Sequence, residues 1–139
     1  MTRSHAAELA IFGSSDGVVA CTGVVLAEAA HGPAAVIAAA IGLLIAEGLG
    51  MAASEWLADE DMSVSEAALM GVSTALPIAF VAAPWLLARG SVALSASLGM
   101  AVLVGVLVAL ERRGGARGWA ETFGVLGVVA VLSWVGGLL

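Results

Sequence analysis

Residues 33–57 read PAAVIAAAIGLLIAEGLGMAASEWL, and this stretch decides the fold class. It is longer than the roughly 20 apolar residues that a helix needs to cross a bilayer, and its charged residues are Glu47 and Glu55 alone. Such a run predicts a membrane-spanning helix. The remainder of the chain repeats the pattern, so we expect several spans of this kind.

The other apolar stretches are separated by short breaks of polar, glycine and proline residues. No stretch between them is long enough to form another domain. The sequence therefore predicts an all-α integral membrane protein with five transmembrane helices, in a single transmembrane domain over residues 1–139. We expect the spans near 10–30, 33–57, 66–88, 91–110 and 119–139.

Composition excludes other classes of protein. Of the 139 residues, 61% are hydrophobic and 12% are charged, a balance too apolar for a soluble domain or a disordered chain. The formal net charge is −6 at pH 7, so the chain offers no basic face and no nucleic-acid partner is expected. The one cysteine, Cys21, excludes an intrachain disulfide.

Arginine positions predict the orientation. Five spans place the termini on opposite sides, and Arg89 is the one arginine on the second side. The positive-inside rule then puts the N-terminus in the cytoplasm and Leu139 outside. The composition, free of lysine, favours a bacterial inner membrane. The arginines on the cytoplasmic side are Arg3, Arg112, Arg113 and Arg117.

Tryptophans, which favour the two membrane interfaces, agree with this orientation. Trp56 and Trp119 fall at the expected inner interface, and Trp85 and Trp134 fall near the outer one.

Three carboxylates lie within the expected spans, where an ionised group costs at least ~2.5–3.5 kcal/mol at the helix centre. They are Asp16, about 9 Å into the first span by helical rise, and Glu47 and Glu55 in the second. The short turn between the two spans makes them antiparallel neighbours. Glu47, Met51 and Glu55 follow at i, i+4 and i+8, so they share a helix face at the depth of Asp16. Carboxylate oxygens with a thioether suit borderline divalent ions such as Fe²⁺ or Mn²⁺, which predicts a metal pathway.

The segment from Gly13 to Gly17 matches G-x-S-x-G but opens an apolar helix and lacks a nearby histidine base, so no enzyme is expected. The two glycines instead predict close helix approach. We expect a homodimer that contacts through this face.

Two motifs resemble the vacuolar iron transporter family. Residues 11–19 read IFGSSDGVV and match a G-x-x-D-G signature in the first span. Residues 48–57 read GLGMAASEWL and are similar to S-M-A-x-G-E-[YF]-x-S at the end of the second. The resemblance is specific over these two spans and loose over the others.

This resemblance implies a homodimer of five-helix protomers that exports Fe²⁺ or Mn²⁺ from the cytosol against protons, with the metal as substrate and no cofactor. It places Asp16 and Met51 in the translocation path and makes Glu55 the motif acid, whereas Glu47 is proposed from this sequence alone. Gly50, Ser54 and Trp56 depart from the motif. The cytosolic metal-collecting domain of many members is missing, as in the short, nodulin-like branch.

Two other functions stay open. A proton-coupled exporter of organic cations would explain Asp16 but not Met51. A helical accessory subunit would use its polar residues only to hold helices together.

Overall fold

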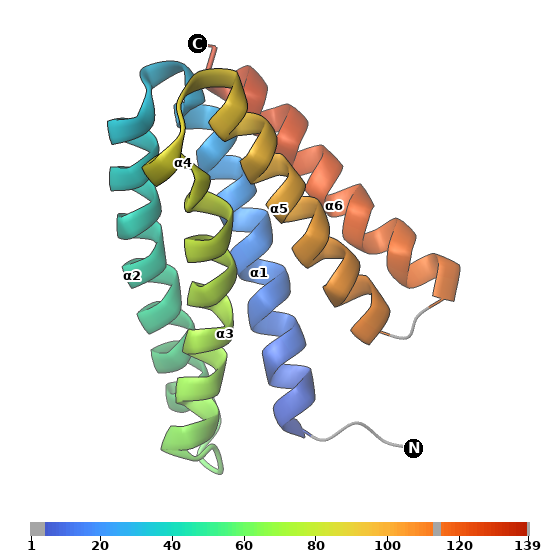
Figure 1. Ribbon diagram of the computed structural model, residues 1–139. Coiled ribbons are helices and arrows are strands. Elements are labelled where there is room, and N and C mark those ends of the chain that lie inside the picture. Colours follow the sequence, from blue (N-terminus) through green and yellow to red (C-terminus); the bar gives the residue numbers. More distant parts are fainter. Residues whose placement is uncertain (1–4, 113–114, 139) are drawn as a thin grey trace.

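The computed structural model describes residues 5–112 and 115–138, all of which lie in helices and the turns between them. Five stretches of this part are long and apolar enough to cross a membrane. The prediction of an all-α, five-span membrane protein is therefore confirmed. The elements are α1 (His5–Glu28), the 3₁₀ turn η1 (Ala29–His31), α2 (Pro33–Ala58), α3 (Val64–Ala82), the short α4 (Pro84–Leu87), α5 (Gly90–Glu111) and α6 (Gly115–Gly136) (Figure 1).

Two helices begin earlier than the hydropathy pattern predicts. Helix α1 begins at His5 rather than near residue 10, and α6 begins at Gly115 rather than near residue 119. Hydropathy detects the apolar core of a span, whereas the helix continues into the polar interface. In α6 the early turns carry an i, i+4 ion pair in which Arg117 Nε lies 2.7 Å from Glu121 Oε1.

The turns between helices follow from local chemistry. Gly32 has a φ of +94°, a conformation that glycine adopts readily, and Pro33 then opens α2 at a position that needs no N–H donor. At the start of α3, Ser63 and Glu66 form a capping box.

Proline also interrupts the third span. Pro84 has no N–H to continue the hydrogen bonding of α3, so the regular helix is interrupted at Ala83 and restarts as α4. Trp85, which follows Pro84, packs inside the bundle, where its side chain is 2% exposed. This tryptophan therefore faces the core, and its position near the outer interface stays a prediction. Trp56, Trp119 and Trp134 do remain on the surface.

Helix α3 lies between α1 and α2 and packs along both, and α5 and α6 lie on the other side of α1 (Figure 1). The centre of the core is formed where Val18 and Cys21 of α1 meet Ile78 of α3. Gly13 and Gly17 are buried in this same contact, against the α3 backbone. The prediction that their face forms a dimer contact is wrong, because α3 of the same chain already covers it.

The bundle has two distinct ends. The start of α1, the α2–α3 loop, the end of α5 and the start of α6 lie at one end, called here the N-terminal end, and the end of α6 lies at the other (Figure 1). Arg112 and Arg117 belong to the N-terminal end and Arg89 to the opposite one. Arg3, Arg113 and Leu139, which also entered the topology prediction, lie outside the described residues.

Candidate functional site

Asp16 lies near the middle of α1. It is eleven residues from His5, which corresponds to about 16 Å along the helix axis. His5 and Glu8 belong to the polar start of the helix, so this length is not a depth in the bilayer, and the expected depth of about 9 Å stays a prediction. The side chain is partly buried and makes no hydrogen bond or ion pair with the described residues. Asp16 is thus a carboxylate inside a span that has no partner among the described residues.

Helix α2 carries the other three predicted residues, and all are partly buried. Glu47 is eleven residues from Ala58, the end of α2 that lies at the N-terminal end of the bundle. Asp16 and Glu47 are therefore at matching positions in two neighbouring helices. Within the described part of the chain, the carboxylates of Glu47 and Glu55 make no hydrogen bond or ion pair either.

Three acids at the helix ends have partners. Glu28 Oε2 lies 3.4 Å from His31 Nδ1, and Glu66 accepts hydrogen bonds from Ser63. Glu121 pairs with two arginines. Glu8 and Glu111 make no hydrogen bond or ion pair with the described residues, but they lie at helix ends, where water can solvate a carboxylate, whereas Asp16 and Glu47 lie inside spans.

Met51 lies beside a cluster that sequence reasoning missed. It packs against a buried group formed by Leu9, Met62, Ala67 and Met70. Three methionines thus converge from α2, from the α2–α3 loop and from α3. No sequence pattern indicated this cluster, because Met62 lies in the loop before α3 and its convergence with Met51 and Met70 depends on tertiary packing.

The predicted residues do not form a complete acidic metal site within one chain. Across residues 5–112 and 115–138, no group of three or more histidine, cysteine, aspartate or glutamate side chains is placed to hold a metal ion. Asp16, Glu47 and Glu55 are therefore not joined in such a group. Further ligands for an ion at this depth would have to come from Met51, from water or from a second copy of the chain.

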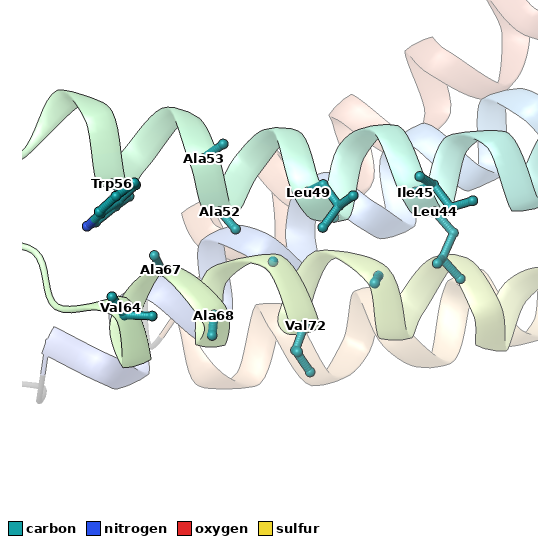
Figure 2. Close-up of a pocket in the computed structure, with 13 residues that line it drawn as sticks. Leu44, Ile45, Leu49, Ala52, Ala53, Trp56, Val64, Ala67, Ala68 and Val72 are labelled. Carbon is teal, nitrogen blue, oxygen red and sulfur yellow. The ribbon is translucent and has the colours of Figure 1, made fainter.

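The groove between α2 and α3 is not the candidate path. It encloses about 760 Å³ and is lined by apolar side chains and glycines, with Trp56 and Val64 near one end and Leu44 and Ile45 near the other (Figure 2). None of the four predicted residues lines it. An apolar groove on the flank of a membrane helix pair suits lipid acyl chains, not a hydrated cation.

A smaller and more polar hollow lies at the N-terminal end. It encloses about 340 Å³ and is lined by Glu8, Ile11, Phe12, Ser15 and Arg112. Ser15 is the sequence neighbour of Asp16. The hollow thus brings polar surface to the turn of α1 that carries the mid-span carboxylate.

Comparisons of this chain with protein-family models, with curated proteins and with solved structures give no significant match.

Proposed function

We propose that this protein is a proton-coupled transporter that exports a divalent transition metal, Fe²⁺ or Mn²⁺, from the cytosol. One observation carries the proposal: Asp16, Glu47 and Glu55 are partly buried in membrane-spanning helices, and their carboxylates have no hydrogen-bond or ion-pair partner among the described residues. A bare carboxylate in this setting is costly, and such groups typically mark ion or proton pathways. The resemblance to vacuolar iron transporters in the same two spans supports the same function.

The donor types favour a transition metal as the substrate. Carboxylate oxygens bind either a proton or a cation, so each can exchange one for the other, which is the chemistry that antiport needs. The Met51 thioether adds a polarisable ligand that favours Fe²⁺ or Mn²⁺ over Mg²⁺ or Ca²⁺. Under this proposal Asp16 and Glu47 hold the ion at mid-depth, with Met51 and Glu55 one and two turns nearer the cytosol.

A homodimer is part of the proposal. One chain offers no group of three acids to an ion among its described residues, and a second copy would double the carboxylates near a shared axis. Because α3 covers the Gly13 and Gly17 face, we place the contact on the side of α1 and α2 that bears Asp16 and Glu47. Chemical cross-linking in lipid is expected to capture dimers, and monomers alone would contradict this part.

The proposed orientation puts the N-terminal end of the bundle in the cytoplasm of a bacterial cell. Arg112 and Arg117 at that end, against Arg89 at the other, support it through the positive-inside rule.

Flux into proteoliposomes of the purified full chain tests the function. We expect uptake of Fe²⁺ or Mn²⁺ that grows with an opposing proton gradient and collapses when a protonophore removes the gradient. Transport of a hydrophobic organic cation without metal flux would instead favour the drug-exporter alternative. Absence of any flux from a correctly folded and reconstituted chain would favour an accessory subunit.

A further inference from the structure

The N-terminal end of the bundle gathers a histidine, a carboxylate and three methionines from separate segments. His5 begins α1, Glu66 and Met70 lie in the first turns of α3, Met62 lies in the α2–α3 loop, and Met51 lies in α2. These five residues are called here the capture group. They combine nitrogen, oxygen and sulfur donors, and Met51, one turn from Glu47 on α2, links the group to the mid-span carboxylates.

The outer part of the capture group is the pair of His5 and Glu66. Glu66 Oε2 accepts from the Ser63 backbone N–H at 2.9 Å and from the Ser63 hydroxyl at 2.6 Å, which fixes the carboxylate in place. The other oxygen, Oε1, lies 4.0 Å from His5 Nε2. Two donors each about 2.1 Å from one metal ion lie roughly 3.0–4.2 Å apart, so the pair is spaced to share an ion.

The inner part is sulfur. His5 and Leu9 are four residues apart on α1, and Glu66 and Met70 are four residues apart on α3, so each outer residue lies one turn from a member of the buried cluster. Met62 is 8% exposed and Met70 is 2% exposed, and Met51 packs against the same cluster. A buried cluster that contains three methionines therefore lies about one helical turn from the imidazole and the oriented carboxylate.

We propose that the capture group binds a divalent transition metal ion at the cytoplasmic mouth, before the ion reaches Asp16. This inference rests on the proposed function and identifies where the cargo is first held. The loop between α2 and α3 spans only residues 59–63, so no separate domain between these helices collects metal. Nitrogen, oxygen and thioether donors together select Fe²⁺ over hard ions such as Mg²⁺.

Equilibrium dialysis of the purified full chain with Fe²⁺ under anaerobic conditions tests the site. The background carries Asp16→Asn and Glu47→Gln, which removes the deep carboxylates that would compete for the ion. In this background we expect Met62→Leu with Met70→Leu to weaken Fe²⁺ binding at least tenfold, because leucine keeps the packing and removes the sulfur. His5→Gln changes an exposed residue and is expected to weaken binding similarly without affecting the fold.

Met100→Leu is the matched control, since Met100 packs against the core on α5, away from the capture group. It should leave Fe²⁺ affinity unchanged. Affinity that survives both His5→Gln and the leucine pair would overturn the site. A loss with His5→Gln alone would overturn the role of sulfur and with it the capture group as proposed.

Dialysis and flux separate the two proposals. If Fe²⁺ binds as expected but no variant of the chain transports it, the capture group stands and the transport function fails. If flux is observed and the dialysis shows no dependence on His5, Met62 and Met70, the transport function stands and the capture group fails.

Discussion

Gly17 of α1 lies directly against the backbone carbonyl of Thr74 in α3, with no space between them for a Cβ atom. One turn earlier, a Cβ at Gly13 would lie 2.9 Å from the carbonyl oxygen of Met70. These two contacts let the backbones of α1 and α3 approach closely. They fix α3 between α1 and α2 and so leave the Asp16 carboxylate on a different side of α1.

Gly17→Ala is therefore expected to destabilise the bundle. The added methyl meets backbone atoms that cannot rotate away, and overpacking of this kind typically costs about 1–3 kcal/mol. Thermal unfolding in mild detergent, followed by circular dichroism or by retention of monodisperse protein, measures the loss. Gly42→Ala on α2 is the control, because a Cβ there meets nothing within 4 Å. Equal melting temperatures for the two variants would contradict the close contact.

The sequence was sufficient to predict five spans and poor at predicting what lies between them. Hydropathy locates the spans because each membrane-spanning helix must by itself satisfy its backbone hydrogen bonds and present apolar side chains to the bilayer. It also located Asp16 and Glu47 in neighbouring spans, but it missed the start of α1, because polar residues such as His5 and Glu8 continue the helix beyond the apolar core.

Sequence patterns of this kind could not predict which residues contact one another between helices of the folded bundle. The spacing of Gly13 and Gly17 indicated a close helix contact but could not tell α3 of the same chain from α1 of a second copy. Met62 was assigned no role, because its position beside Met51 depends on how the α2–α3 loop folds back. The burial of Trp85 likewise depends on how α4 packs in the bundle, which a hydropathy window does not detect.

Asp16→Asn is expected to abolish metal transport. The change keeps the size of the side chain and removes both the negative charge and the exchangeable proton, so neither cargo nor coupling ion can bind there. Because the carboxylate has no partner among the described residues, the fold should be unaffected. Proteoliposome flux measures the effect, with Glu60→Gln on the exposed α2–α3 loop as the control. Full transport by Asp16→Asn would remove this residue from the path.

Cysteine labelling in intact cells is expected to place the α2–α3 loop inside and the α4–α5 turn outside. Cys21 is fully buried and its thiol donates to the Ile78 carbonyl oxygen at 3.3 Å. Cys21→Ser keeps a hydrogen-bond donor at this position and removes the one native thiol, so the maleimide reacts with the introduced cysteine alone. Glu60→Cys is a suitable inner probe, whereas Met62 is too buried for this purpose. A membrane-impermeant maleimide should label Arg89→Cys and should label Glu60→Cys only after lysis. The reverse result would invert the proposed topology and put the N-terminal end of the bundle outside.

Met51→Leu distinguishes a metal substrate from an organic cation. The leucine keeps the volume that packs against Met62 and Met70 and removes only the sulfur, so stability should change by less than about 1.5 kcal/mol. If the cargo is Fe²⁺ or Mn²⁺, loss of the polarisable ligand should lower the apparent affinity for it by about tenfold, which corresponds to roughly 1.4 kcal/mol, and Fe²⁺ should suffer more than the harder Mn²⁺.

Initial rates of uptake over a range of metal concentrations, in vesicles with a fixed pH gradient, measure this effect. The Met100→Leu variant should transport both metals as the unaltered chain does. It makes the same replacement of methionine by leucine, but Met100 packs against the core on α5, away from the path. An exporter of organic cations would tolerate Met51→Leu and still lose activity with Asp16→Asn. Unaltered metal affinity in Met51→Leu would mean that the sulfur is not a ligand. Glu47 and Glu55 would then act as two carboxylates separated by a packing residue, and selection against Mg²⁺ would have to come from another part of the path.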